Sequence, residues 1–480
     1  MLLSRANYFI SYHFLIVFLS SLVFKAFPLH GDERPNFVVI LCDDLGYGDI
    51  SCYGNKIIKT PNIDRLASQG IRFTDYYSPS PVCSPSRVGL LTGRTPNRAG
   101  IYDWIPSGTQ FHLEEKEFTI PKMLKRAGYA TCMSGKWHCN GKFNKKSQPQ
   151  PSDFGFDHWF ATQNNAAPSH RNPKNFVRNG EGVGELEGFS CRIVAEEANR
   201  WIENHVTENP DQPFFTFIAF HEPHEPISSP ESMISNYPNA QKKGEALYYA
   251  NVENMDFAVG MIMDCLNRNK VAENTLVIFT SDNGPETLNR YGGAWRSHGS
   301  PGVLRGMKLH THEAGIRVPG VMRWPLQIKA GQVSDEPVNS LDLMPTFANL
   351  AAGEIPIDIQ LDGTDIVNAF GKDEVIRKRP MFWCYYSALN KSKVALRDGN
   401  WKLLASLKSK NDKYLKIRSL NKSNYDLVKT AKLVDFELYN IGNDNDESLN
   451  LVDKNHDEFK RLSEAMRMMF DEVLKDSKIW

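Results

Sequence analysis

Short, uninterrupted apolar runs recur along the first three quarters of the chain, and helical patterns lie between them. Such runs are typical of parallel strands buried on both faces, whereas a strand with one solvated face alternates apolar and polar residues. The pattern predicts strands at residues 37–41, 71–76, 129–133, 214–220 and 275–280. It predicts helices at residues 60–70, 119–128, 189–206 and 255–266. This alternation predicts an α/β fold, with a large, mostly parallel sheet sandwiched by helices.

The pattern changes after about residue 366, where short strands joined by turns replace the longer alternation. Strands are expected at residues 381–383, 393–396, 401–404 and 436–439, and a closing helix at residues 457–474. These elements predict a smaller C-terminal α+β domain, built on a short antiparallel sheet, at residues 371–480. The larger domain would then cover residues 33–370. A lysine-rich stretch at residues 408–432 is interpreted as a solvated insertion.

The first 31 residues are typical of a targeting segment. Arg5 precedes an apolar run at residues 14–24, and a polar stretch begins at Gly31. This run matches the apolar core of a signal peptide and falls short of the roughly 20 residues that a membrane span needs. We therefore expect export, to the periplasm or as a secreted protein, with no stable membrane span after cleavage. A signal anchor stays open, because the apolar stretch can be extended to residues 9–27.

Composition and charge exclude several classes of protein. The chain has 480 residues, of which 41% are hydrophobic and 23% charged, so it is neither disordered nor a coiled coil. Its 56 basic and 56 acidic residues balance, which leaves no basic surplus for nucleic acid. Eight cysteines are too few for a disulfide scaffold, although Cys132 and Cys139 could pair in an exported protein.

Polar clusters follow four of the predicted strands. They contain Asp43 and Asp44, Lys136 and His138, His221 and His224, and Asp282 and Asn283. In open α/β sheets, ligands bind outside the carboxyl ends of the strands. A single aspartate after a strand is usually a helix cap, but four clusters at one edge favour a binding site. The carboxylate and amide oxygens among them favour calcium or magnesium over zinc, with caps and turns as the alternative.

The most specific motif is Cys83-Ser-Pro85-Ser86-Arg87, followed by a Leu-x-x-Gly-Arg pattern that ends at Arg94. It resembles the signature of the type I sulfatases at every fixed position. Further segments that resemble this family are Gly135–His138, Pro223–Pro226, Ser281–Gly284, Arg305–Lys308 and Glu437–Tyr439. The resemblance extends from Asn36 to about Leu451. The chain departs from the family pattern at Cys139-Asn140 and at Ala314, neither of which is assigned to chemistry.

The resemblance implies an alkaline phosphatase-like fold and hydrolysis of sulfate monoesters. A formylglycine-generating enzyme would oxidise Cys83 to an aldehyde, whose hydrate attacks sulfur and then expels sulfate, so that two steps replace one. Cys83 would lie at the N-terminus of a helix over residues 84–91, where exposed N–H groups favour sulfate. One calcium ion would be bound by an oxygen of the modified Cys83 and by Asp43, Asp44, Asp282 and Asn283.

The resemblance also assigns roles to the remaining site residues. Arg87 would hold the aldehyde hydrate, and Lys136 and Lys308 would neutralise sulfate oxygens. His138 would take the proton from the second hydroxyl when sulfate is eliminated. His224, with Lys308, would protonate the leaving alcohol.

Two other functions stay open. One is a phosphodiesterase or phosphonate monoester hydrolase of the same superfamily, and the other is a non-catalytic, calcium-dependent glycan-binding protein. A sulfated saccharide is the favoured substrate class. Trp104, Trp159 and Trp295 could stack on sugar rings or belong to the core, and His221 could be functional or structural.

Overall fold

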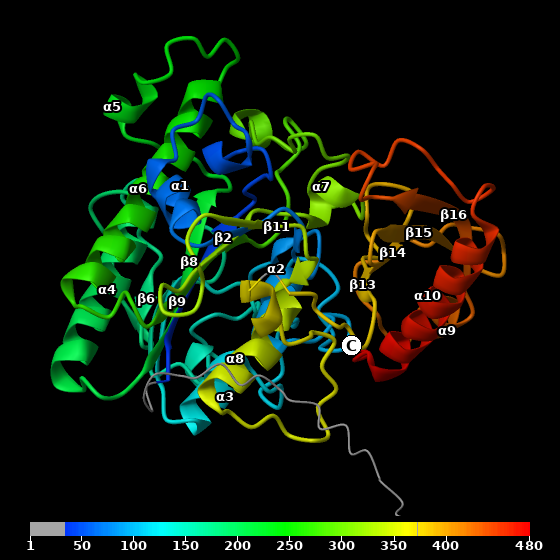
Figure 1. The fold of residues 1–480 in the computed structure, drawn as a ribbon, viewed down its shortest axis with the longest axis horizontal. Helices are drawn as coiled ribbons and strands as arrows, with labels where there is room; N and C mark the ends of the chain where they lie inside the picture. The colour runs from blue at the N-terminus through cyan, green and yellow to red at the C-terminus, as the bar shows by residue number, and fades with distance from the viewer. Residues whose placement is uncertain (1–33, 372) are drawn as a thin grey trace, which may run out of the picture. The chain divides into compact units, whose positions relative to one another are not determined.

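A ten-stranded sheet forms within the residues that the computed structural model describes, 34–371 and 373–480 (Figure 1). Its strands lie in the order β11-β2-β10-β9-β1-β8-β4-β5-β6-β7. They are β1 (Asn36–Asp43), β2 (Ile71–Phe73), β4 (Ala130–Lys136), β5 (His158–Thr162), β6 (Val177–Arg178), β7 (Glu181–Gly182), β8 (Phe214–Pro223), β9 (Thr275–Ser281), β10 (Gly320–Arg323) and β11 (Gln332–Ser334). The central strands β9, β1, β8, β4 and β5 are parallel, which confirms the mostly parallel sheet.

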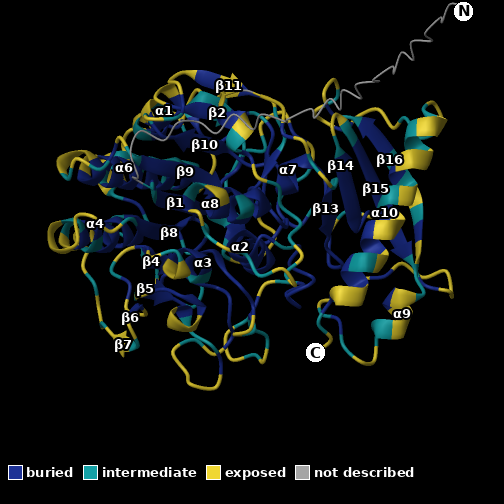
Figure 2. Cartoon of the chain, turned by 60° about the horizontal axis from the view of Figure 1, so that its bottom comes forward, coloured by how far each residue is buried: buried dark blue, intermediate teal, exposed yellow. Residues whose placement is uncertain are grey.

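Helices cover both faces of this sheet, as the alternation predicts (Figure 2). Along β1, Val38 and Ile40 belong to one apolar core, and Phe37, Val39 and Leu41 belong to the other. Because side chains alternate along a strand, one uninterrupted apolar run supplies both cores. The first core includes α1 (Pro61–Ser68), α4 (Ser190–Glu208) and α6 (Glu245–Arg268), and the second includes α2 (Cys83–Thr92), α3 (Ile120–Arg126) and α8 (Leu343–Ala351).

The prediction of one strand at residues 71–76 is wrong. The structure divides it into β2, in the large sheet, and β3 (Tyr76–Tyr77), which pairs with β12 (Val338–Asn339). Asp75 lies between the two strands. Its carboxylate forms ion pairs with Arg317 and Arg397, and these contacts stabilise the turn of the chain at this point. The outer strands β5 to β7 and β10 to β12 were not predicted, because they are short and lack a clear pattern.

The C-terminal part contains a four-stranded antiparallel sheet within residues 373–480, as expected. Its strands are β13 (Met381–Cys384), β14 (Val394–Asp398), β15 (Trp401–Lys408) and β16 (Lys432–Asn440). The closing helix α10 (His456–Asp476) packs through Met466 and Phe470 against residues of this sheet. The domain boundary at residue 370 stays a prediction. Three short helices complete the α-helices of the described residues, α5 (Glu231–Ile234), α7 (Glu313–Ile316) and α9 (Tyr425–Lys429).

The lysine-rich stretch at residues 408–432 is not simply a solvated insertion. Leu415, Leu420 and Val428 are buried and belong to the C-terminal core. These apolar side chains hold the stretch against the sheet, so its charged residues have defined neighbours.

The expected signal peptide or anchor, residues 1–31, lies outside the described residues. Within residues 34–371 and 373–480, no helix is long and apolar enough to span a membrane. Export therefore stays a prediction.

Candidate active site

The four polar clusters meet at one edge of the large sheet. Asp43 ends β1, Lys136 ends β4, Pro223 ends β8 and Ser281 ends β9, and these strands are neighbours in the order β9-β1-β8-β4. The register places Asp43 opposite Pro223. Because the strands are parallel, the residues that follow them are gathered above the same edge.

Oxygen ligands converge at this edge. Asp43, Cys83 and Asp282 each offer a ligand atom within 4.8 Å of the other two. Asn283 Nδ2 donates a hydrogen bond to Asp44 Oδ1 at 2.7 Å. Asp43 Oδ1 and Asn283 Oδ1 are buried and have no hydrogen-bond partner among the described residues. Since buried polar atoms are nearly always satisfied, two unpaired oxygens beside carboxylates fit a hard cation such as calcium.

Arg87 is buried behind this group and is held on two sides. Its Nε donates to Asp282 Oδ2 at 2.9 Å, and its Nη1 donates to the Lys136 carbonyl at 2.9 Å. Burial, together with the nearby Asp43 carboxylate, raises the pKa of Asp282 to about 7. Arg87 thus links α2 to the ends of β4 and β9.

Two lysines neutralise the other carboxylates. Lys308 Nζ lies 2.6 Å from Asp44 Oδ1, and Lys136 Nζ donates to Asp43 Oδ2. Although burial acts in the opposite direction, the cations, led by Lys136, hold the pKa of Asp43 well below its usual range. Burial likewise opposes the charge of Lys308, yet Asp44 raises the pKa of this ammonium group well above its usual range. Lys308 therefore stays charged in a buried site.

Cys83 is the first residue of α2 and is 3% exposed. No side chain of the described residues caps this helix, so its first N–H groups remain available to an anion. Burial raises the pKa of the Cys83 thiol to about 11, although Lys136 and Lys308 oppose this. At neutral pH the unmodified side chain is a thiol, which is a poor nucleophile.

In each of the two candidate proton carriers, His138 and His224, a backbone carbonyl faces one of the two ring nitrogens. His138 Nε2 lies 3.1 Å from the Ile105 carbonyl oxygen, while Nδ1 is buried without a partner among the described residues. His224 Nδ1 lies 2.6 Å from the Glu225 carbonyl oxygen, and its Nε2 lies 3.6 Å from Asp44 Oδ2. A carbonyl only accepts, so the nitrogen that faces it carries a proton. Each ring therefore has one nitrogen left for chemistry.

Burial lowers the pKa of both histidines. For His138, the nearby Lys136 and Arg87 lower the pKa further, whereas for His224 the Asp44 carboxylate opposes the effect of burial. His221 is also buried, and its Nε2 lies 2.8 Å from Thr162 Oγ1. It is absent from the cavity wall described next, which favours a structural role.

A cavity of about 870 Å³ opens above this edge. Of the predicted site residues, Cys83, His138, His224 and Lys308 line it, whereas the remaining ones lie behind them. Trp104 also lines the cavity and is 42% exposed. Trp159 is buried in a core, and Trp295 is absent from the cavity wall. A ligand in the cavity would thus contact Cys83, the imidazoles of His138 and His224, and the ammonium group of Lys308.

Comparison with known proteins identifies the family. The Sulfatase family model matches residues 35–354, and the model described as N-sulphoglucosamine sulphohydrolase, C-terminal, matches residues 307–476. The chain belongs to the sulfatase family. Human (Homo sapiens) arylsulfatase A is 35% identical over 392 residues, which cover 77% of this chain and 74% of that protein. The N-acetylgalactosamine-6-sulfatase of Rattus norvegicus is 34% identical over 375 residues, which cover 73% and 68%.

A solved structure extends this similarity to nearly the whole chain. The crystal structure of Ps i-CgsB in complex with k-i-k-neocarrahexaose matches with a TM-score of 0.76 and 28% sequence identity, covering 93% of this chain and 94% of that one. The resemblance to the sulfatases and the predicted fold class are therefore both confirmed. The protein is a hydrolase of the sulfatase family.

The residues that depart from the sulfatase motif pattern, Cys139, Asn140 and Ala314, do not line the cavity. Cys139 is buried, with its thiol facing the Trp137 carbonyl, and Asn140 Nδ2 donates to the Pro149 carbonyl at 2.7 Å. All eight cysteines lie in the described part of the chain and are free thiols, so Cys132 and Cys139 form no disulfide here.

Sequence reasoning missed the loop residues that line the rest of the cavity. Those with chemistry of interest are Asp103, Asn164, Asn165, Arg290, Tyr291, Arg296, Tyr385, Lys416 and Arg418. They come from segments far apart in the chain and match no motif, so no local pattern could have identified them. The sulfatase motifs thus predict one end of the cavity and leave the other end unassigned.

Proposed function

We propose that this sulfatase hydrolyses sulfate monoesters of a sulfated carbohydrate, with a formylglycine made from Cys83 and one bound calcium ion. The observation that carries this is the position of Cys83, on the cavity wall, at an uncapped helix N-terminus and within ligand distance of Asp43 and Asp282. The relatives support the substrate class, since one is named for a sulfated amino sugar and one was solved with a neocarrahexaose.

Asp43, Asp44, Asp282 and Asn283 are the residues that would hold the calcium ion. When bound, such an ion withdraws negative charge from the reacting group. Asp43 Oδ1 and Asn283 Oδ1 have no hydrogen-bond partner among the described residues, so both oxygens are free to serve as ligands. Lys308 lines the cavity beside Asp44 and is placed to neutralise sulfate oxygens there.

The nucleophile is proposed to be a hydroxyl of the formylglycine hydrate. An unmodified Cys83 is unsuited to this task, because burial keeps its thiol protonated at neutral pH. The free N–H groups at the start of α2 would bind sulfate oxygens. Arg87 is proposed to hold the hydrate from behind, in the position that Asp282 and the Lys136 carbonyl give it.

The tautomers divide the proton transfers between the two histidines. His138 carries its proton on Nε2, toward Ile105, so the lone pair of Nδ1 is free to accept a proton when sulfate is eliminated. His224 donates through Nδ1 to Glu225, so the proton for a leaving alcohol would be a second one, on Nε2. The Asp44 carboxylate, 3.6 Å from Nε2, favours that second proton, whereas burial lowers the pKa of the ring. The lowered pKa of His138 suits a base that must start neutral.

Maturation and export belong to the same proposal. A formylglycine-generating enzyme is the partner that converts Cys83, and residues 1–31 would direct export and then be removed. N-terminal sequencing of the exported protein tests the second point, because a signal anchor would leave residues 1–31 attached.

The experiment for the function combines conversion with turnover. The protein is produced with and without a formylglycine-generating enzyme, the mass of the tryptic peptide with Cys83 is measured, and sulfate release from sulfated sugars is followed. We expect an aldehyde mass and sulfate release only after conversion. Faster cleavage of phosphodiesters or phosphonates would favour the superfamily alternative, and a converted protein that binds but never cleaves sulfated sugars would favour a binding protein.

A further inference from the structure

The cavity extends well beyond the end that would hold sulfate. Its volume of about 870 Å³ is near the upper end of the roughly 300–1,000 Å³ found for small-molecule sites. Cys83, His138 and Lys308 occupy one end, and the outer wall includes Trp104 and Tyr291, which are 42% and 37% exposed. A cavity of this volume can hold more than one sugar unit.

Two cations of the outer wall differ from the others, because they form no ion pair with the residues that the structure describes. Arg290 Nε lies 2.6 Å from Glu286 Oε1, and Arg296 Nε donates to Glu225 at 3.1 Å, so these charges are neutralised within the wall. Lys416 and Arg418 also line the cavity. Within residues 34–371 and 373–480 neither side chain forms a hydrogen bond or an ion pair, although Arg418 lies close enough to Asp103 to oppose the rise that burial causes in the pKa of that carboxyl. Both side chains are exposed.

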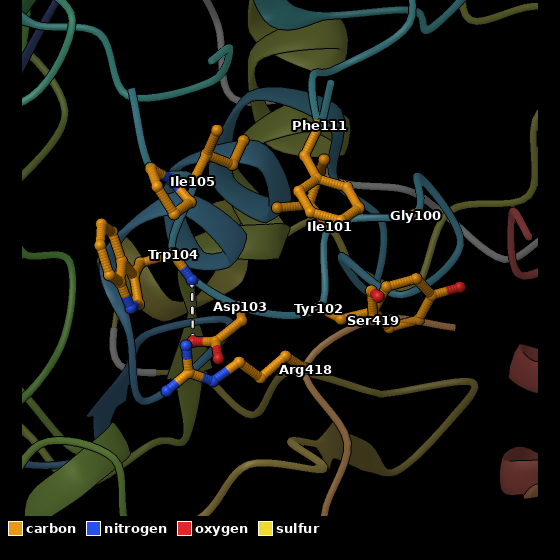
Figure 3. A pocket seen from close by; sticks show the side chains of 10 residues that line it. Gly100, Ile101, Tyr102, Asp103, Trp104, Ile105, Phe111, Arg418 and Ser419 are labelled. Atoms are coloured by element: carbon orange, nitrogen blue, oxygen red, sulfur yellow. Dashed lines mark hydrogen bonds between the residues drawn. The ribbon is translucent and has the colours of Figure 1, made fainter. Parts of the chain in front are cut away.

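One carboxylate lies close to Arg418, and it has other partners. Figure 3 shows the Arg418 side chain extending beside Asp103 toward Trp104. Asp103 accepts hydrogen bonds from Trp104 N at 2.9 Å and from the Tyr385 hydroxyl at 3.0 Å. Asp103 can orient the Arg418 guanidinium. Because it is one negative charge beside two positive charges, Lys416 and Arg418 keep a net positive charge.

The backbone hydrogen bonds of the segment that contains Lys416 and Arg418 explain why both side chains lie on the same side of it. Leu415 is buried and its N–H donates to the Leu407 carbonyl at 2.9 Å. The Ile417 carbonyl accepts a hydrogen bond from Ser387 Oγ at 2.8 Å, and Ser387 itself lines the cavity. Leu415 and Ile417 thus face the protein while Lys416 and Arg418, which alternate with them, face the cavity. This segment is part of the lysine-rich stretch.

We propose that Lys416 and Arg418 bind a second anionic group, a sulfate or a carboxylate, on the sugar unit next to the one that loses its sulfate. The exposed indole of Trp104, beside Arg418, would stack on the ring of that unit (Figure 3). Guanidinium and ammonium groups form their strongest hydrogen bonds with such anions. The proposal rests on the proposed function and deepens it: the substrate is a polyanionic saccharide rather than a singly charged ester.

Binding tests this without turnover. The full chain is produced without a formylglycine-generating enzyme, loaded with calcium, and titrated calorimetrically with three disaccharides. All three carry the same sulfated sugar, and the neighbouring unit is a neutral hexose, a uronic acid or a second sulfated hexose. The set is made once with sulfated galactose and once with sulfated N-acetylgalactosamine. We expect the two charged neighbours to bind about tenfold more tightly than the neutral one, which is the worth of one charge-assisted hydrogen bond.

The variants assign the effect to the two side chains. Arg418→Ala and Lys416→Ala should each remove most of the preference for a charged neighbour, Arg418→Lys should keep part of it, and added salt should weaken it. Lys413→Ala, an exposed lysine of the same segment outside the cavity wall, should keep the full preference. The difference between the uronic acid and the second sulfate identifies which anion is preferred.

The failing outcomes are distinct. Equal binding of neutral and charged disaccharides, or no binding of any of them, overturns the anion subsite. An equal loss for all ligands in Arg418→Ala does so too, because it indicates a structural role. Absence of sulfate release by the converted enzyme counts against the proposed function instead, since these titrations involve no turnover.

Discussion

Removing each histidine in turn gives a sharp test of the proposed chemistry. His224→Ala removes the imidazole whose Nε2 faces the cavity, while its Nδ1 is held by the Glu225 carbonyl at 2.6 Å. A sugar alcohol is a poor leaving group and needs a proton, whereas nitrophenolate leaves without one. General acid assistance is worth roughly 10²–10⁴-fold, so His224→Ala should lose that factor on a sugar sulfate and less than about tenfold on nitrophenyl sulfate. The two losses then differ by at least about 1.4–4 kcal/mol in activation free energy.

His138→Ala should behave differently, because the unpaired Nδ1 of His138 is proposed to act after the alcohol has gone. Both substrates should slow toward one common turnover rate, and a sulfated enzyme should accumulate. The assay is steady-state turnover on both substrates, with intact mass measured after quenching. His112→Ala is the matched control, since His112 Nδ1 also faces a carbonyl, that of Gln110 at 2.6 Å, but lies outside the cavity wall. Equal losses for both variants on both substrates, with no sulfated enzyme, would refute this division.

Three further predictions concern the modification, the metal and the link to the C-terminal sheet. Cys83→Ala should abolish turnover with little change in urea unfolding, and a fully active protein with an alkylatable Cys83 would contradict the mechanism. Chelation should remove activity and calcium restore it, Asp282→Ala should cost most of it, and active protein with zinc at full occupancy would exclude the assignment. The ammonium group of Lys402 lies 2.7 Å from Glu313 and 2.9 Å from Glu447, two buried carboxylates. Lys402→Met removes this group and should lower the free energy of unfolding by about 3–5 kcal/mol. Because losing that cation raises the folded-state pKa of both carboxyls, this cost should grow as pH rises from 5 to 8 in urea titrations, and a constant cost would refute it.

The sequence predicted those parts of the site that depend on local pattern. Asp43 and Asp282 follow apolar runs that form parallel strands, so strand ends alone brought them to one edge. Lys308 follows no predicted strand, and only its resemblance to a family motif indicated a role. The pairing of Lys308 with Asp44 joins residues 264 positions apart and cannot be inferred from either segment alone.

The outer cavity shows why substrate preference is harder to predict than chemistry. A run of lysines in a polar stretch is normally a solvated surface, and nothing local distinguishes Lys416 from Lys413. The difference arises because Leu415 and Leu420 belong to the C-terminal core, which leaves Lys416 and Arg418 facing the cavity. Sulfate chemistry needs a few residues at strand ends, and these recur as motifs. Recognition of the rest of the proposed saccharide would depend on loops that line one cavity from distant parts of the chain. Their arrangement depends on packing, so it leaves no fixed spacing in the sequence.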